Sequence, residues 1–403
     1  MYGARPSITG IGLVTPIGAD RQSFWDALVQ GRSGAREIRS FDASDLPTRI
    51  GCEVGEHEVP PPLRWALLGG RCTELAALAA VQAVEEAGID VRRHADAAVV
   101  VGTTMGEVTQ FEQNRAAHPD RAPSVDDVRS LTRRPLDVIG RSVARIWDLH
   151  GAVLSVPAAC AAGAYAIGVA ASLVARGDAP WALAVGCEAF SRMAFVGFSR
   201  MRAMSPDRCR PFSLGRPGLL LGEGAGAVVV EPQEAARARG AEVWGHVDGF
   251  GLSCDAYHVT GPHPRGAGAT RAMRDALTRA GVGPEDVDYV NAHGTGTALN
   301  DKTESLAVRA VFGERGATVP VSSIKALTGH MMGAAGAVEA IASLLAMRHS
   351  TIPPTWNWEA RDPECDIDCV PNRPREARLH RVLSNSYAFG GNNASLLLTA
   401  PEA

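Results

Sequence analysis

One stretch, Leu154–Arg176, limits what this chain can fold into more than any other. It begins in a short apolar run, Val153–Val156, whose length and β-branched content are typical of a strand. Pro157 interrupts that run because proline cannot donate to a strand ladder. After Cys160 comes an Ala-rich segment of helix-forming composition, ended by the turn residues Gly177-Asp178-Ala179-Pro180. The sequence therefore predicts a buried strand joined to a helix, with Cys160 at the joint.

The position of Cys160 carries a chemical expectation. At a helix N-terminus, unpaired amides and the positive end of the helix dipole favour thiolate over thiol. Gly163 and Gly168 each cost about 1 kcal/mol against alanine inside a helix, so we expect another segment to pack closely against this backbone. A lone cysteine is more often a buried structural residue than a nucleophile, and the rest of the chain must decide between the two.

Composition excludes several classes of protein. Hydrophobic residues make up 46% of the chain and charged residues 21%, values typical of a globular protein. The first residues lack a basic-then-apolar signal region, and we expect no apolar stretch of the roughly 18–20 residues that span a bilayer. The eight cysteines lack the spacing of a disulfide framework, and the net charge of −4 argues against general nucleic-acid binding. We therefore expect a cytoplasmic enzyme with reduced thiols and with neither nucleic acid nor membrane as a partner.

The second half of the chain repeats the order of the first. A helix ending in Ala-Gly, a polar linker, an apolar strand and a Gly/Thr loop occur around residues 87–104 and again around 280–297. Next, the strand, loop and Ala-rich helix of Val153–Val174 have their parallel in Val319–Leu345. Two matched units in the same order indicate a duplication.

Alternating strands and helices predict an α/β fold with mostly parallel sheets. The helices after Cys160 and after His330 are apolar all round, so we expect them to be buried. The predicted architecture is a duplicated α-β-α-β-α fold with two mixed sheets around central helices. Its N-terminal half, residues 1–240, carries the cysteine, and its C-terminal half, residues 241–403, carries two histidines and a lysine. In the second half, the region Lys325–His330 corresponds to Cys160.

Equivalent loops of such a fold end on the same side, which brings several chemical groups together. They are the Cys160 thiol, His293 in NAHGTGT, and Lys325 and His330 in SSIKALTGHMMGAAGA. Lys325 is notable because the 40 basic residues include only one other lysine, Lys302. A zinc site is one interpretation, although the local Cys and His spacing of such sites is missing. Packing residues are a second interpretation, and a nucleophile with acid–base partners and oxyanion-binding amides is a third.

At these residues the chain resembles the β-ketoacyl-acyl-carrier-protein synthases of the elongating type, which have the thiolase fold. The resemblance runs from Ile8 to Leu398 and is carried by AACAAG around Cys160, GEGAG at 222, DAYHVTGPHP at 255, DYVNAHGTGTALND, SSIKALTGHMMGAAGAVEAI and SYAFGGNN. It implies an acyltransferase that condenses a cysteine-bound acyl chain with malonyl-acyl-carrier protein, releasing carbon dioxide and giving a β-ketoacyl-carrier protein. It implies no cofactor beyond the phosphopantetheine of the acyl carrier protein, and a homodimer or a heterodimer with a chain-length-factor-like subunit.

The resemblance also implies a role for each matching residue. Cys160 would be the nucleophile, and His293 and His330 would bind the malonyl carbonyl and stabilise the enolate. Lys325, paired with Glu339, would organise the site. The other implied roles are an oxyanion hole from the amides of Cys160 and Phe389, pantetheine binding by Thr295 and Thr297, and an acyl-pocket wall and gate at Met105 and Phe389.

The second histidine indicates the subclass. Synthases that start chains from coenzyme A thioesters resemble Cys-His-Asn and thiolases use a second cysteine, whereas this chain has His330. Departures from the family pattern at Ser213–Leu219 and Gly102–Glu107 slightly favour a specialised polyketide or polyene pathway over fatty-acid synthesis. The alternatives are a non-catalytic chain-length-factor-like subunit, against which the intact Cys160 counts, and an initiating synthase or thiolase that uses acyl-coenzyme A.

Four arginines are candidates for docking an acidic carrier protein. Arg202 and Arg200 are the first candidates, and Arg64 and Arg71 the second. Each has a plainer interpretation as a solvated surface residue. Docking by charge would make association sensitive to salt.

Overall fold

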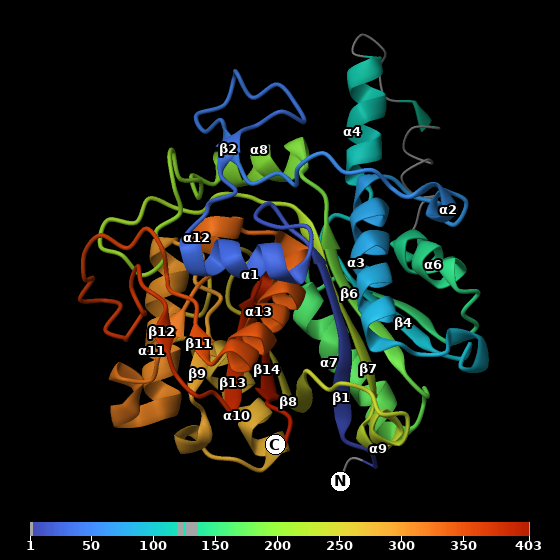
Figure 1. Cartoon of the computed structure of the whole chain (residues 1–403). Helices are drawn as coiled ribbons and strands as arrows, with labels where there is room; N and C mark the ends of the chain where they lie inside the picture. The colour runs from blue at the N-terminus through green and yellow to red at the C-terminus, as the bar shows by residue number, and fades with distance from the viewer. Residues whose placement is uncertain (1–2, 119–123, 126–135, 403) are drawn as a thin grey trace.

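The computed structural model describes residues 3–118, 124–125 and 136–402. These residues form a ten-stranded sheet that consists of two five-stranded halves (Figure 1). From the junction outwards, the first half contains β1 (Pro6–Val14), β7 (Gly224–Pro232), β6 (Ala182–Glu188), β4 (Ala98–Gly102) and β5 (Val153–Val156). The second half contains β8 (Gly245–Cys254), β14 (Asn392–Thr399), β13 (Arg381–Tyr387), β9 (Tyr289–Asn291) and β10 (Val321–Ser322). Two short ladders, β2 (Arg36–Glu37) with β3 (Ile50–Gly51) and β11 (Thr351–Ile352) with β12 (Arg375–Glu376), lie outside this sheet.

The two halves have the same topology. In each, the three strands nearest the junction pair antiparallel with one another. The third of these, β6 or β13, then pairs parallel with the fourth strand, and the fourth pairs parallel with the fifth. The halves meet where β1 pairs with β8 through only two residue pairs, Ser7 with His246 and Ile8 with Gly245. The predicted α/β architecture with mixed sheets is therefore confirmed, and the two predicted sheets are joined along this short edge. The expectation of mostly parallel strands was wrong, because five of the nine strand pairings in this sheet are antiparallel and four are parallel.

Helices form three layers around the two half-sheets (Figure 1). Outside the first half lie α3 (Arg71–Ala87) and α6 (Asp137–Ile146), and outside the second lie α10 (Ala267–Ala280) and α11 (Ala298–Phe312). Between the half-sheets, α7 (Ala162–Arg176) packs against α13 (Ala335–His349). The other α-helices of the described residues are α1 (Arg21–Gln30), α2 (Pro61–Arg64), α4 (Val108–Ala117), α8 (Arg192–Arg200), α9 (Gln233–Ala238) and α12 (Lys325–Thr328).

The central helices approach closely because each carries a glycine at the crossing. A Cβ atom on Gly163 would lie 2.7 Å from the amide nitrogen of Ala337, and one on Gly336 would lie 2.7 Å from that of Ala164. Gly168 is covered in the same way by the ring of Phe250, 2.2 Å from where its Cβ would be. The close packing expected from Gly163 and Gly168 is confirmed.

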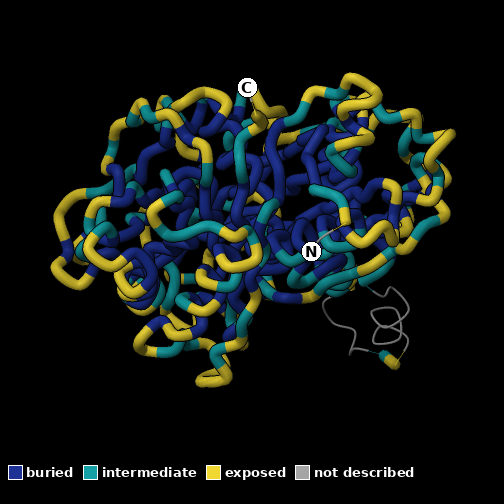
Figure 2. Tube along the Cα trace, turned by 90° about the horizontal axis from the view of Figure 1, so that it is seen from below, coloured by how far each residue is buried: buried dark blue, intermediate teal, exposed yellow. Residues whose placement is uncertain are grey.

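The expectation that no apolar stretch has membrane-spanning length was wrong. The helical segment Ala159–Arg176 has 18 residues with a mean hydropathy of 1.5, which suffices by length and composition. However, 67% of it is buried inside the protein, between the half-sheets and against α13. Figure 2 shows this buried interior, with the exposed residues in the surrounding loops. The hydropathy of the segment is explained by its place as a core helix.

Candidate active site

Cys160 lies in a strained turn that the duplication repeats. It sits in the 3₁₀ turn Ala159–Ala161, which leads directly into α7, and Ala159 has a φ of 48°. The corresponding turn before α13 is Met332–Ala334, in which Met332 has a φ of 45°. Positive φ is costly for a residue with a side chain, by about 1–3 kcal/mol, and such strain is concentrated at functional sites. The counterpart of Cys160 is therefore Gly333, and the predicted correspondence with Lys325–His330 was displaced by a few residues.

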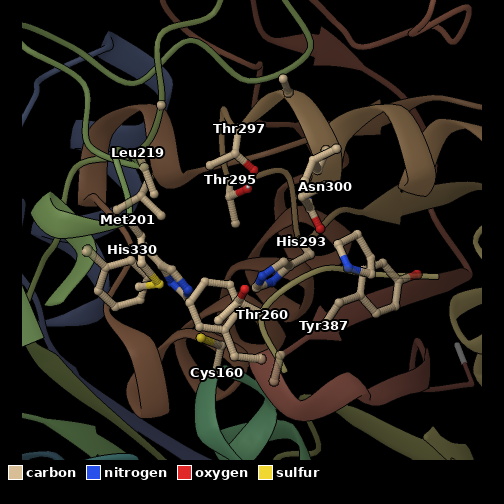
Figure 3. A pocket seen from close by; sticks show the side chains of 18 of the residues that line it. Cys160, Met201, Leu219, Thr260, His293, Thr295, Thr297, Asn300, His330 and Tyr387 are labelled. Atoms are coloured by element: carbon tan, nitrogen blue, oxygen red, sulfur yellow. Dashed lines mark hydrogen bonds between the residues drawn. The ribbon is translucent and has the colours of Figure 1, made fainter. Parts of the chain in front are cut away.

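Cys160, His293 and His330 line one cavity of about 340 Å³. In Figure 3 the Cys160 side chain lies at its base, with the rings of both histidines above it and Thr295 and Thr297 further up. Other lining residues are exposed: Leu299 is 64% and Met201 is 42% accessible to solvent. The sulfur thus lies at the inner end of a cavity that opens to the surface, as a nucleophile that meets a tethered substrate requires.

The surroundings of the Cys160 sulfur have opposing effects on the pKa of its thiol. Burial raises the pKa of its thiol to about 12, while the charge of Lys325 and the amides of Phe389 and of Cys160 itself, which point at the sulfur, act to lower the pKa. Burial is the largest of these influences, so the resting group is a thiol. The expected preference for thiolate was wrong, because the helix terminus is too deeply buried to hold a charge cheaply. The two amides that converge here are those predicted to form an oxyanion hole.

The two imidazoles are neutral. Burial, with the nearby Lys325 charge, holds the pKa of His293 and of His330 well below the ordinary value. Their rings lie 5.2 Å apart, edge to face. Lys325 Nζ can only donate and lies 3.4 Å from Nδ1 of His293, so that nitrogen is the acceptor and Nε2 carries the proton. Nδ1 of His330 is buried and has no hydrogen-bond partner among the described residues. A buried acceptor without a partner is less unusual than a buried donor without one, so we assign the proton of His330 to Nε2 as well.

Lys325 and Glu339 form a fully buried ion pair beneath the histidines. Nζ of Lys325 also donates to the carbonyl of His293 at 2.6 Å. Burial raises the pKa of Glu339 to about 7, against the attraction of Lys325. This lysine comes from α12 and the glutamate from α13, so the pair ties the two elements around His330 to the loop that carries His293.

Three buried carboxylates shape the site, and none of them was predicted from the sequence. Glu304 accepts the amides of His293 and Gly294 at 2.9 and 2.8 Å and fixes that turn. Asp301 accepts the amide of Gly296 at 3.2 Å, one turn earlier on the same helix, α11. Glu188, at the end of β6, accepts the amides of Thr104 and Met105 after β4 and the amide of Gly333 before α13. The only signal in the sequence was the type of residue: an acid ending an apolar strand, and two acids three residues apart on one helix.

The remaining predicted residues divide into those at the cavity and those away from it. Thr295 and Thr297 line it, with their hydroxyl oxygens 2.8 Å apart. Phe389 also lines it and stacks on Phe198 at 5.4 Å. Met105 does not line it but packs in the apolar cluster that contains both phenylalanines.

The four arginines proposed for docking are not equivalent. Arg202 is exposed at the rim of the cavity, and Arg200 is exposed two residues earlier. Arg64 and Arg71 do not line the cavity. Arg71 forms an ion pair with the buried Glu223 at 2.7 Å and donates to the carbonyl of Val54, which explains its presence structurally.

The loop Ser213–Leu219, where the sequence departs from the family pattern, is held in place by a buried arginine. Arg216 is buried in this loop, pairs with Asp362 and Asp301, and donates to the carbonyls of Thr297 and Ala298. The loop therefore closes one side of the cavity and holds the start of α11 in place. Among the described residues, no group of three or more histidines, cysteines or acids is placed to hold a metal ion.

A cysteine facing two neutral imidazoles and two converging amides is the site of an enzyme that carries an acyl group on sulfur. Comparison with known proteins agrees. Residues 5–236 match the family "Beta-ketoacyl synthase, N-terminal domain", and residues 244–359 match "Beta-ketoacyl synthase, C-terminal domain". The chain belongs to the beta-ketoacyl synthase family, is of its elongating type, and is an acyltransferase.

Its similarity to individual proteins extends over the whole chain. It is 40% identical to a 3-oxoacyl-[acyl-carrier-protein] synthase 2 of Coxiella burnetii, over 98% of each chain. Among solved structures it is similar to the ishigamide ketosynthase/chain length factor, at 39% identity and a TM-score of 0.90, over 99% of this chain and 100% of that one. It is also similar to a ketosynthase solved with a type II PKS acyl-carrier protein and bound to the hexaketide, at 26% identity and a TM-score of 0.89, over 99% and 100%.

Proposed function

We propose that the protein elongates an acyl chain held on Cys160 by decarboxylative condensation with malonyl-acyl-carrier protein. The observation that carries the proposal is the cavity that places the thiol beneath two neutral imidazoles. An active condensing enzyme is favoured over a chain-length-factor-like subunit because the nucleophile is present at the inner end of an open cavity. It is favoured over an initiating synthase because both histidines line that cavity.

The first half-reaction loads the acyl chain. The Cys160 sulfur forms a bond to the thioester carbonyl carbon while the bond from that carbon to the pantetheine sulfur breaks. The thiol proton passes to the leaving pantetheine thiolate, so that the enzyme and the carrier exchange an acyl group for a proton. The amides of Phe389 and Cys160 stabilise the charge on the carbonyl oxygen during the exchange.

The second half-reaction forms the carbon–carbon bond. The bond between the malonyl carboxylate and its α-carbon breaks, carbon dioxide leaves, and the electron pair becomes an enolate whose oxygen accepts from Nε2 of His293 and of His330. The α-carbon then bonds to the acyl carbon as the bond to the Cys160 sulfur breaks, and the released thiolate takes up a proton from water to restore the thiol. No strong base is needed, because decarboxylation itself supplies the electron pair, and neutral donors in a dry site stabilise the enolate.

The partner and pathway are part of the proposal. The similar structures include a ketosynthase with a chain length factor and one with an acyl-carrier protein, which supports both kinds of partner. In the described chain β5 ends the sheet with its outer edge unpaired and Leu154 37% exposed, an edge suited to pairing with a second subunit. We propose a dimer through this strand, in the cytoplasm, since all eight cysteines are free thiols. The similarity to a ketosynthase solved with a type II PKS acyl-carrier protein supports a specialised polyketide chain as the substrate.

The test is intact-mass analysis of carrier-protein products. Purified protein, alone and with candidate chain-length-factor partners, is incubated with acyl- and malonyl-carrier protein. We expect β-ketoacyl-carrier protein, its loss in Cys160→Ala, and its retention in Cys369→Ala, which removes a buried thiol far along the sequence in a different core cluster. Product formation by Cys160→Ala would refute the proposal, and product only in the presence of a partner would assign the heterodimer.

A further inference from the structure

Glu188 joins two segments of the active site that are distant in sequence. Its carboxylate accepts the amides of Thr104 at 2.8 Å and Met105 at 3.0 Å, and the hydroxyl of Thr103 at 3.3 Å. On the other side it accepts the amide of Gly333 at 3.0 Å, three residues after His330. Four donors around one buried carboxylate are unusual, and such charge-assisted bonds are among the stronger ones in proteins. The geometry fixes the loop after β4 relative to the turn before α13.

The Glu188 carboxylate occupies space that a side chain at Gly333 would otherwise fill. Gly333 is the counterpart of Cys160 in the second half, and it has no side chain. A Cβ atom there would lie 2.8 Å from Oε2 of Glu188 and 2.7 Å from Cα of Thr103. At the position where the first half of the fold has the Cys160 side chain, the second half has no side chain, and the carboxylate of Glu188 takes its place.

Glu188 also lies near enough to Cys160 for their charges to interact, because the turn Ala159–Ala161 that holds Cys160 packs against the turn Met332–Ala334, whose Gly333 amide Glu188 accepts. Burial raises the pKa of Glu188 to about 7, and the amides of Met105, Thr104 and Gly333 favour its charged form. Its charge acts to raise the pKa of Cys160, in opposition to Lys325. Other titratable groups among the described residues that interact with this region are Cys187, which precedes Glu188 on β6, Cys72 of α3, and Glu107 beyond the same loop.

We propose that Glu188 is a positioning residue of the condensation reaction: it holds the Thr103–Met105 loop at a fixed distance from the turn that follows His330, and it keeps a negative charge within electrostatic reach of the nucleophile. The first role rests on the proposed function, because Met105 of this loop packs in the apolar cluster that contains Phe389, the predicted gate of the acyl pocket. The second role is a property of the thiol and does not depend on the substrate.

The charge role is tested by alkylation of Cys160 with iodoacetamide between pH 6 and 9, followed by mass spectrometry of the Cys160 peptide. In Glu188→Gln we expect alkylation at pH 8.5 to be on the order of 10-fold faster than in the wild type, because a repelling charge is gone. The ratio should fall towards one at pH 6, where Glu188 is protonated in the wild type as well. A ratio that is the same at every pH indicates only easier access and overturns the charge role, as does a ratio of one throughout.

The positioning role is tested by acyl loading with carrier-bound thioesters of increasing length. Glutamine replaces one acceptor oxygen by a donor, so two of the four donors lose their partner. We expect kcat/KM for the longest accepted chain to fall on the order of 10-fold relative to the shortest. Glu188→Asp keeps the charge but not the reach, so it should show the wild-type pH dependence of alkylation together with the altered length preference. An unchanged length preference in both variants overturns the positioning role.

Glu231→Gln is the matched control. Glu231 is a buried carboxylate on the adjacent strand β7. It lies near the end of β7 that is away from Glu188, and it accepts hydrogen bonds from Thr9 and Arg239. Loss of stability alone would affect this variant in the same way, so equal behaviour of the two variants contradicts the proposal. If the wild type forms no β-ketoacyl product, the proposed function fails, and the alkylation profile still decides the charge role of Glu188.

Discussion

Replacing Lys325 by methionine separates the stability of the site from its chemistry. The lysine and Glu339 are both 1% exposed, so Lys325→Met leaves a buried carboxylate without its partner. Removing one member of such a pair costs about 3–5 kcal/mol of unfolding free energy. The cost should be smaller at pH 6 than at pH 8, because the pKa of Glu339 is already raised to about 7 and the unpaired carboxyl can take up a proton.

The double variant Lys325→Met/Glu339→Leu restores an apolar match. Because a buried ion pair is often no better than well-packed apolar residues, we expect its unfolding free energy in urea to return to within about 1–2 kcal/mol of the wild type. Decarboxylation of malonyl-carrier protein should stay low in both variants, by about 10²-fold or more, since Lys325 no longer fixes the proton of His293 on Nε2. The reasoning is refuted if the double variant regains decarboxylation together with stability, or if stability is lost equally at both pH values.

Three further outcomes follow from the geometry. Because the pKa of both His293 and His330 lies well below 6.5, the decarboxylation rate should show no fall between pH 8 and 6 that protonation of an imidazole would cause. The unfolding free energy, measured in urea, should however decrease as the pH falls below 6.5, because the histidines of the unfolded chain then take up protons that the buried ones do not. Gly163→Ala should lower the unfolding free energy by about 1–3 kcal/mol, since its Cβ would meet the Ala337 amide, whereas Gly197→Ala, with nothing within 4 Å, should raise it by about 0.5–1 kcal/mol. Arg202→Glu should raise KM for carrier-bound malonyl several-fold at low salt and leave KM for a small malonyl thioester unchanged; an equal change for both substrates would contradict carrier docking.

The fold was predictable because its signals are local. Gly88 ends α3 in the left-handed conformation, where the Ala-Gly pair at residues 87–88 predicted a helix end. The repeated order of strands and helices was also readable. The exact counterpart of Cys160 was not, because Ala159 and Met332 reveal their correspondence only through their positive φ, which no composition rule predicts for these residue types.

The site was predictable where chemistry depends on rare residue types. Cys160 and Lys325 stand out from a chain that is rich in alanine and has two lysines. Glu188 and Glu304 do not stand out, because an acid becomes important only when the tertiary structure leaves backbone amides unpaired beside it. The sequence showed their residue type but not which amides they would accept.

The one chemical expectation that failed also explains how the site works. A local argument gave Cys160 a thiolate, but burial outweighs the helix terminus and raises the pKa of the thiol, just as it lowers the pKa of both imidazoles. The resting site therefore holds neutral groups above one internal ion pair. A neutral thiol resists wasteful alkylation and oxidation, and it needs to release its proton only when a thioester is present to accept the sulfur. Neutral imidazoles that donate from Nε2 stabilise an enolate as it forms without protonating it first. The same desolvation thus protects the nucleophile and strengthens the hydrogen bonds that decarboxylation depends on.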